Sequence, residues 1–339
     1  VAAALLKEQG YHVIGATMRL WTYSDSCNMK HEGCCAESAV EDARRVCDKL
    51  GIDFYVMNFK DMFKDKVVDY FVDEYIHGRT PNPCIACNKY LKFDALLKKA
   101  LAMGIDYVAT GHYAKIEKGE DGKYILRASE AVKKDQSYVL YNFTQEQLAH
   151  TLMPLGGYNK DWVRQKAEEL GLGVAHKPDS QEICFVEDDD YAKFITDYSG
   201  YKPKEGDILD VNGNVIGKHR GLIYYTIGQR KGIGAYGRPM FVMKIDAENN
   251  TITLGEKGME FSNELTAYDV NFVSGEFPKE NMLITAKVRY QAPPAAAMLC
   301  PQKDGTVKLM FPEPQRAVTP GQAVVFYDGD IVLGGGTVL

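Results

Sequence analysis

Two of the eight cysteines in this chain form a Cys-x-x-Cys pair, Cys84 and Cys87, beside a predicted helix. They lie in residues 80–89, where Pro81 and Pro83 limit the motion of the backbone. The positive end of a helix dipole stabilises a thiolate, which is the nucleophilic form of cysteine. The spacing therefore predicts reactive thiols, although an inert or zinc-binding pair is an alternative because Cys-x-x-Cys alone is a weak motif.

A further thiol, Cys184, lies between Ile183 and Phe185, directly after the polar residues 179–182. The apolar flanks favour a buried strand cysteine that only packs. The polar run before it instead favours a loop beside a site. Both interpretations stay open on local pattern alone.

The remaining cysteines do not complete a zinc site. A structural zinc cage needs a second spaced pair, whereas Cys34 and Cys35 are adjacent and Cys27 stands apart. A four-thiolate cage is therefore disfavoured, and no role is predicted for these three. We interpret Cys47 and Cys300 as packing residues.

The elements that must position these thiols alternate between strand and helix in the first half of the chain. Strands are predicted over residues 11–18, 52–59 and 106–113, and helices over residues 37–50, 60–77 and 88–103. Repeated βα units of this length predict a parallel sheet covered by helices, with ligands at the carboxyl ends of the strands. Gly111 stands near such an end, where a backbone can approach a nucleotide closely; a simple turn glycine is the alternative.

The pattern changes along the rest of the chain. Asp-Gly predicts a hairpin over residues 114–128, and helices follow at residues 144–152, 161–170 and 189–198. After about residue 200, hairpins are predicted at residues 206–217 and 240–256. Short strands over residues 283–339 predict a barrel or a sandwich.

The bulk composition is that of an ordinary globular protein. The 339 residues predict two or three domains, with 45% hydrophobic and 25% charged residues. No apolar run of about 18 residues occurs, so we expect no membrane association. The eight cysteines without a secretory signal predict a reducing cytoplasm. The chain begins without Met inside a predicted helix, so we expect residues to precede Val1.

The net charge of −6 argues against nucleic-acid binding over the whole surface but allows a local basic groove. One basic cluster suits phosphate contacts, although a solvated face is the alternative. Its members are Lys202, Lys204, Lys218, His219, Arg220, Arg230 and Lys231. Tyr224 and Tyr225 could stack on bases or pack in a core.

Several motifs occur in one order over essentially the whole chain, and together they resemble the tRNA-specific 2-thiouridylase family (MnmA/TrmU). The motifs are Thr80-Pro81-Asn82-Pro83 followed by Cys87-Asn88, Ala109-Thr110-Gly111-His112-Tyr113, Lys134-Asp135-Gln136-Ser137-Tyr138, Asp179-Ser180-Gln181-Glu182-Ile183-Cys184-Phe185, Thr226-Ile227-Gly228-Gln229-Arg230-Lys231-Gly232, Thr319-Pro320-Gly321-Gln322 and Gly334-Gly335-Gly336.

The resemblance implies ATP-dependent 2-thiolation of the wobble uridine of tRNA, by adenylation of its C2 oxygen and sulfur transfer from a cysteine persulfide. Cys87 matches the nucleophile and Cys184 the persulfide carrier. The matching positions for ATP are Met18 and Gly111; those for the target base and tRNA are Asn82, Pro83, Cys84, Lys134, Asp135, Gln136, Arg289 and Tyr290.

The resemblance also implies a fold: a parallel-sheet α/β nucleotide-binding domain of the adenine nucleotide alpha hydrolase-like (PP-loop) class, then a small central tRNA-binding domain and a C-terminal β-barrel. We expect these domains at residues 1–200, 201–257 and 258–339. The implied cofactor is ATP with Mg²⁺. The implied partners are tRNA and a sulfur-donor protein, either a persulfide relay or a cysteine desulfurase, and we expect a monomer.

The sequence departs from the family pattern in two places. The pyrophosphate loop, Ser-Gly-Gly-Val-Asp-Ser, is expected just before Val1 and is absent from the chain. Such a loop surrounds phosphates with backbone N–H groups. Cys84 stands where many relatives carry Asp, and a thiol is a weaker acceptor than a carboxylate. With Cys87 and Cys184 it gives three thiols, which could hold an iron–sulfur cluster with one open iron.

Three other classes of protein remain possible. A pyrophosphate-loop amidating ligase would share the βα core without needing Cys87 and Cys184. A thiol oxidoreductase would explain the Cys-x-x-Cys pair but not the C-terminal β region. A non-catalytic tRNA-binding protein is possible because the pyrophosphate loop is absent from the chain.

Overall fold

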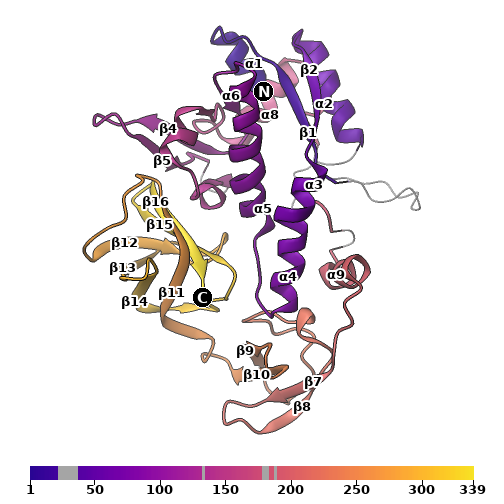
Figure 1. The fold of residues 1–339 in the computed structure, drawn as a ribbon, viewed down its shortest axis with the longest axis vertical. Coiled ribbons are helices and arrows are strands. Elements are labelled where there is room, and N and C mark those ends of the chain that lie inside the picture. Colours follow the sequence, from indigo (N-terminus) through magenta and orange to yellow (C-terminus); the bar gives the residue numbers. More distant parts are fainter. Residues whose placement is uncertain (22–36, 132–133, 178–182, 187–188) are drawn as a thin grey trace. The chain divides into compact units, whose positions relative to one another are not determined.

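The computed structural model describes residues 1–21, 37–131, 134–177, 183–186 and 189–339 (Figure 1). The chain folds into two compact units. The first comprises Val1–Val68, Cys84–Asp189 and Asp330–Val332; the second comprises Asp69–Pro83, Asp190–Gly329 and Leu333–Leu339. The chain thus passes from the second unit into the first between Pro83 and Cys84.

The parallel strands of the first unit form two short sheets. β1 (Gly15–Arg19) pairs in parallel with β2 (Phe54–Asn58), and β3 (Val108–Ala109) with β6 (Thr151–Leu152). The predicted α/β class is confirmed, but the strands are shorter than predicted. Residues after 109 leave β3 because Thr110 Oγ1 bonds to the ring of His112 and the backbone of Tyr113 bonds to Gln136.

Helices pack on these strands. The first unit contains α1 (Ala2–Glu8), α2 (Glu37–Leu50), α3 (Lys60–Phe63), α6 (Leu96–Ala102), α7 (Gln145–Ala149), α8 (Lys160–Glu169) and a 3₁₀ turn at Ser137–Leu140. α2 lies against β1 and β2. A Cβ at Gly15 would collide with Cys47 Sγ, so glycine allows the close approach. The burial of Cys47 agrees with its predicted packing role.

Two long helical stretches contain π-helical segments. Residues 60–76 run through α3, a π segment at Lys64–Asp69 and α4 (Tyr70–Ile76). Residues 83–102 run through α5 (Pro83–Ala86), a π segment at Cys87–Ala95 and α6 (Figure 1). The predicted start of the second helix at residue 88 is wrong: it begins at Pro83, since proline suits the first helical turn. Cys84 and Cys87 therefore lie inside the helix.

The predicted hairpins are present. β4 (Ala114–Lys118) and β5 (Tyr124–Ala128) pair across Gly122, whose φ of +83° requires glycine. In the first unit, Ile331 also pairs with Arg127 of β5. β7 (Gly206–Leu209) pairs with β8 (Val215–His219), and β9 (Met240–Asp246) with β10 (Thr251–Glu256); these form a sheet in the order β8-β7-β10-β9.

The second unit also contains α9 (Tyr191–Ser199), which packs on α4 through aromatic pairs. The rings of Tyr75 and Tyr191 lie 4.7 Å apart, and those of Phe71 and Phe194 lie 6.4 Å apart. Among the residues that the structure describes, no helix is long and apolar enough to cross a membrane.

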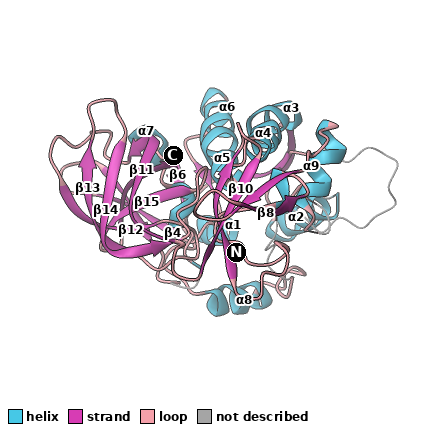
Figure 2. Ribbon diagram, turned by 90° about the horizontal axis from the view of Figure 1, so that it is seen from below, coloured by secondary structure: helices cyan, strands magenta, loops and turns pink. Residues whose placement is uncertain are grey.

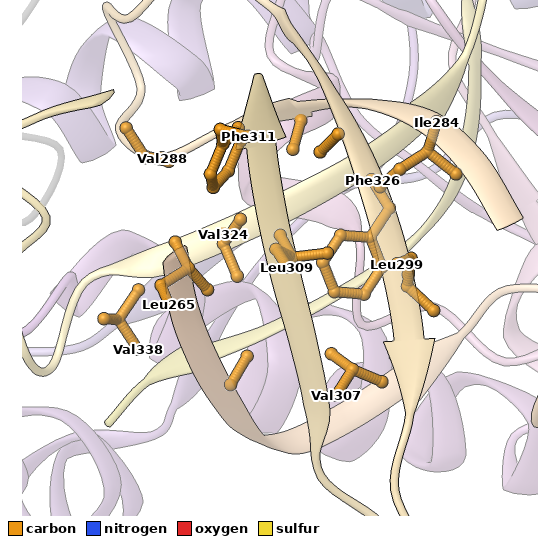
Figure 3. Packing of buried hydrophobic residues seen from close by; sticks show 13 residues of the cluster. Leu265, Ile284, Val288, Leu299, Val307, Leu309, Phe311, Val324, Phe326 and Val338 are labelled. Atoms are coloured by element: carbon orange, nitrogen blue, oxygen red, sulfur yellow. The ribbon is translucent and has the colours of Figure 1, made fainter. Parts of the chain in front are cut away.

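The C-terminal strands close into a barrel, which decides between the two predicted all-β forms. Its strands are β11 (Phe261–Phe272), β12 (Met282–Lys287), β13 (Ala295–Pro301), β14 (Val307–Arg316), β15 (Ala323–Asp328) and β16 (Ile331–Val338). The order is β11-β14-β13-β12-β15-β16, and β11 pairs with β16 to close the ring. Of these strands, Figure 2 labels β11 to β15. Leu299, Leu309 and Phe326 fill its centre (Figure 3).

Candidate functional site

The helix that begins at Pro83 presents its two cysteines differently. Cys84 is exposed, whereas only 8% of Cys87 is accessible to solvent. The neighbouring Asn88 is 3% exposed, and its Nδ2 donates to the carbonyl oxygen of Val139 at 3.0 Å. This bond fixes the Cys87 end of the helix against the 3₁₀ turn, while Cys84 faces outward.

Cys184 lies in a short turn and is partly exposed. The interpretation of this residue as a buried strand cysteine is therefore wrong. The next residue, Phe185, is 3% exposed and packs with Phe63 and Trp21, at ring distances of 5.7 and 6.5 Å. Burial of Phe185 anchors the turn, and the neighbouring Cys184 is partly exposed.

α3 connects the two thiol-bearing segments. Phe63 at its end packs against Phe185, and α3 also contacts the π segment that starts at Cys87. Trp21 joins the same cluster two residues after β1 ends. The carboxyl end of β1, the turn of Cys184 and the helix of Cys87 therefore share neighbours in the first unit.

The proposed nucleotide contacts lie at strand ends, as predicted for this fold class. Met18 is half-buried near the end of β1, and Gly111 is exposed two residues after β3. Gly111 does not have a positive φ, and a Cβ there would meet only Leu155, at 3.6 Å. Neither strain nor packing within the protein therefore requires glycine at this exposed position.

His112 was not singled out from the sequence, although it follows Gly111 in the same motif. Its Nδ1 lies 2.8 Å from Thr110 Oγ1, and its ring packs 5.7 Å from that of Phe93. Burial, together with the nearby charge of Lys92, lowers the pKa of His112 from 6.5 to about 3. The imidazole is therefore neutral near pH 7 and holds the backbone beside Gly111.

The segment of Lys134, Asp135 and Gln136 is tied into the first unit by two of its side chains. Asp135 Oδ1 accepts the backbone N–H groups of Ser129 and Ser137, at 3.0 and 3.1 Å. Gln136 Oε1 accepts the Tyr113 N–H at 2.9 Å, and the Gln136 N–H donates to the Tyr113 carbonyl at 2.9 Å. These two side chains hold the segment to the motif that contains Gly111.

The remaining predicted contacts belong to the second unit. Asn82 is partly exposed in the stretch that leads to Pro83. Arg289 and the exposed Tyr290 follow β12, and Lys287 Nζ lies 5.8 Å from the centre of the Tyr290 ring. Arg289 Nε is buried without a hydrogen-bond partner among the described residues.

In the structure, the residues of the predicted basic cluster do not all have the same surroundings. His219 is 1% exposed, and its ring bonds to the backbone of Asn250 and Gly221, so it is a core residue. Lys218 pairs with Asp207. Tyr225 is buried in the hydrophobic core of the same region, which agrees with the predicted alternative that it packs in a core.

Comparison with known proteins decides the family. Three family models match consecutive parts of the chain: "tRNA methyl transferase HUP domain" over residues 1–188, "tRNA methyl transferase PRC-barrel domain" over residues 192–256, and "Aminomethyltransferase beta-barrel domain" over residues 262–338. A tRNA-specific 2-thiouridylase MnmA of Acetivibrio thermocellus is 58% identical, over 100% of this chain and 95% of the relative. The chain belongs to the tRNA-specific 2-thiouridylase family. The MnmA proteins of Clostridioides difficile and Clostridium beijerinckii are 57% and 56% identical, over 100% of this chain and 94% of each relative.

Membership in the thiouridylase family confirms the predicted enzyme class, a tRNA-uridine 2-sulfurtransferase. It also confirms the predicted order of a nucleotide-binding α/β domain, a central domain and a C-terminal barrel. The boundaries at residues 200 and 257 stay a prediction.

The iron–sulfur cluster on Cys84, Cys87 and Cys184, given above as an alternative, stays a prediction. Within residues 1–21, 37–131, 134–177, 183–186 and 189–339, no group of three His, Cys, Asp or Glu side chains could hold a metal ion. Of the three thiols, Cys84 is exposed, Cys87 is buried and Cys184 is partly exposed. Cys27, Cys34, Cys35 and residues 179–182 lie outside the described residues.

Proposed function

We propose that this chain replaces the C2 oxygen of the wobble uridine of tRNA with sulfur, using ATP. The observation that carries the proposal is the full-length identity of 58% to a protein named tRNA-specific 2-thiouridylase. The thiols support it, because Cys87 and Cys184 lie on segments that both contact α3.

The first step activates the base. The C2 oxygen of uridine attacks the α-phosphorus of ATP and pyrophosphate leaves, so the oxygen becomes part of an AMP leaving group. We assign the nucleotide to Met18 and Gly111, since the open backbone at Gly111 allows a close approach. Mg²⁺ would accompany the phosphates; its ligands are not assigned. Asn82, Pro83 and Cys84 would face the base, and Lys134, Arg289 and Tyr290 would contact the RNA.

The second step transfers sulfur. Cys184 takes sulfane sulfur from the persulfide of a donor protein, which leaves as a thiol. The terminal sulfur of the Cys184 persulfide attacks C2, and AMP departs with the original oxygen. The Cys87 thiolate then attacks Cys184 Sγ, forming a disulfide and leaving the electron pair on the sulfur of 2-thiouridine. A dithiol reductant restores both thiols.

The different burial of the two thiols supports this division of roles. A sulfur carrier must be reached by a donor protein, and Cys184 is partly exposed on its turn. A resolving thiol has to meet only the carrier, and Cys87 is buried on a helix that Asn88 fixes.

The test uses the full-length protein with tRNA, ATP, a persulfide donor and a dithiol, and mass spectrometry of the nucleosides. We expect 2-thiouridine from the wild type, none from Cys184→Ser, and at most one turnover from Cys87→Ser. Cys300→Ser, a partly exposed barrel thiol, is the matched control and should keep full activity. Absence of 2-thiouridine in the wild type would overturn the function; full activity of Cys184→Ser would overturn the role of Cys184. Anaerobic purification with iron and sulfide analysis tests the cluster alternative.

A further inference from the structure

Residues 226–232 form a turn, here called the basic turn, whose shape is fixed by one of its own side chains. Gln229 Oε1 accepts the backbone N–H of Thr226 at 2.9 Å. Gln229 Nε2 donates to the carbonyl oxygens of Lys231 and Tyr224, at 2.9 and 3.2 Å. Both N–H donors and the oxygen of this amide therefore hold the turn, so the outward groups of the turn are presented in a fixed arrangement.

Those outward groups are two cations. Arg230 and Lys231 are exposed and, with Gln229, line an open pocket of about 570 Å³. Neither cation has an ion-pair partner among the residues that the structure describes, whereas the nearby Lys218 pairs with Asp207. Adjacent unneutralised cations on a preformed turn suit phosphate oxygens, because no carboxylate competes for them.

The basic turn is also bonded to the stretch that leads into Cys84. The hydroxyls of Thr226 and Thr80 share a hydrogen bond, within the second unit. The Thr80 N–H donates to the carbonyl of Pro320 at 2.9 Å, and Gln322 Nε2 donates to the Thr80 carbonyl at 2.8 Å. Thr80 is thus held by the central sheet region on one side and by the barrel on the other.

The stretch from Thr80 to Cys84 is stiff and short. Pro81 and Pro83 fix two of its φ angles, and both are buried. Cys84 is the first residue of the first unit after this stretch. Three residues, 81–83, separate Thr80 from Cys84 in the thiol-bearing helix.

We propose that the basic turn binds the phosphate backbone of the RNA substrate, and that Thr226 is a positioning residue that couples this binding to Asn82, Pro83 and Cys84 through Thr80. The inference rests on the proposed function and names a partner surface for the same site. RNA held at the basic turn would fix the stretch that faces the target base, so thiolation would be fast only on RNA that reaches both places.

The first experiment measures tRNA affinity of the full-length protein at several salt concentrations. The Arg230→Ala/Lys231→Ala variant should lose affinity by on the order of tenfold at low salt and reduce the slope of log K against log salt by about 1–2. Lys218→Ala is the matched control, since its cation is already paired with Asp207. Equal behaviour of the double variant and the control would overturn the phosphate site.

The second experiment tests the coupling. Thr226→Val keeps the side-chain shape but removes the hydroxyl, so tRNA affinity should be unchanged while the single-turnover thiolation rate falls about tenfold, the size of one lost hydrogen bond. Thr226→Ser should restore the rate. An unchanged rate, or a loss of affinity equal to the loss of rate, would overturn the coupling. Wild-type protein that binds tRNA without forming 2-thiouridine would overturn the proposed function instead.

Discussion

Replacing Gln136 with alanine separates a structural role of this residue from the predicted contact with RNA. Tyr113 is 7% exposed, and its N–H lies 2.9 Å from Gln136 Oε1. The alanine variant leaves this buried donor without an acceptor, which costs about 1–3 kcal/mol. The reverse bond, from the Gln136 N–H to the Tyr113 carbonyl, belongs to the backbone and remains.

The assay is urea unfolding of the full-length protein, paired with tRNA binding. We expect Gln136→Ala to lower the free energy of unfolding by about 1–3 kcal/mol with little change in tRNA affinity. Its KM for ATP should rise, because Tyr113 follows Gly111 and His112 directly. Gln136→Glu retains an accepting oxygen and serves as the control, with a smaller loss of stability. Unfolding within about 0.5 kcal/mol of wild type, together with weakened tRNA binding, would refute the reasoning and favour an RNA contact.

Three further predictions concern stability. Gly321 has a φ of +87°, and a Cβ there would lie 3.0 Å from the Thr80 nitrogen, so Gly321→Ala should cost about 1–3 kcal/mol in chemical denaturation. The pKa of His112 is about 3 in the folded protein, against an ordinary value of 6.5. The stability that its neutral ring contributes is therefore complete above pH 6.5 and is lost as the pH falls toward 3. In that window, His112→Gln should reduce the dependence of the free energy of unfolding on pH by up to about 1.4 kcal/mol per pH unit. Phe326 is 0% exposed in the barrel, so Phe326→Ala should lower stability by about 3–5 kcal/mol, while Leu283→Ala, at 82% exposure, should change it little.

Local chemistry explains why much of the fold was predictable. A helix over residues 37–50 follows from its apolar stripe and the stop at Gly51, and its observed bounds are Glu37–Leu50. Turn signals such as Gly122 and Gly213 predicted hairpins because their positive φ is a property of the turn itself. The start of the thiol-bearing helix was missed, since the prolines of residues 80–83 were read as a stiff loop although Pro83 opens the helix.

The family was predictable from the sequence, but the arrangement of the proposed site residues was not. The motif order alone indicated the 2-thiouridylase family and singled out Cys87 and Cys184 for proposed roles. It did not indicate that Phe185 anchors the Cys184 turn against Phe63, because that contact joins segments far apart in the chain. Nor did the motif order indicate that Lys218 pairs with Asp207 whereas Lys231 is exposed on the basic turn.

The cysteines show which features the sequence determined and which only the tertiary structure decided. The sequence determined that Cys84 and Cys87 follow Pro81 and Pro83 and that Cys184 follows a polar run, because residue type and spacing are local. Only the tertiary structure decided which thiol is buried and what holds the stretch before Cys84. Thr80 meets Thr226 and Gln322 across 146 and 242 residues of chain, and no local pattern encodes a hydrogen bond over such separations.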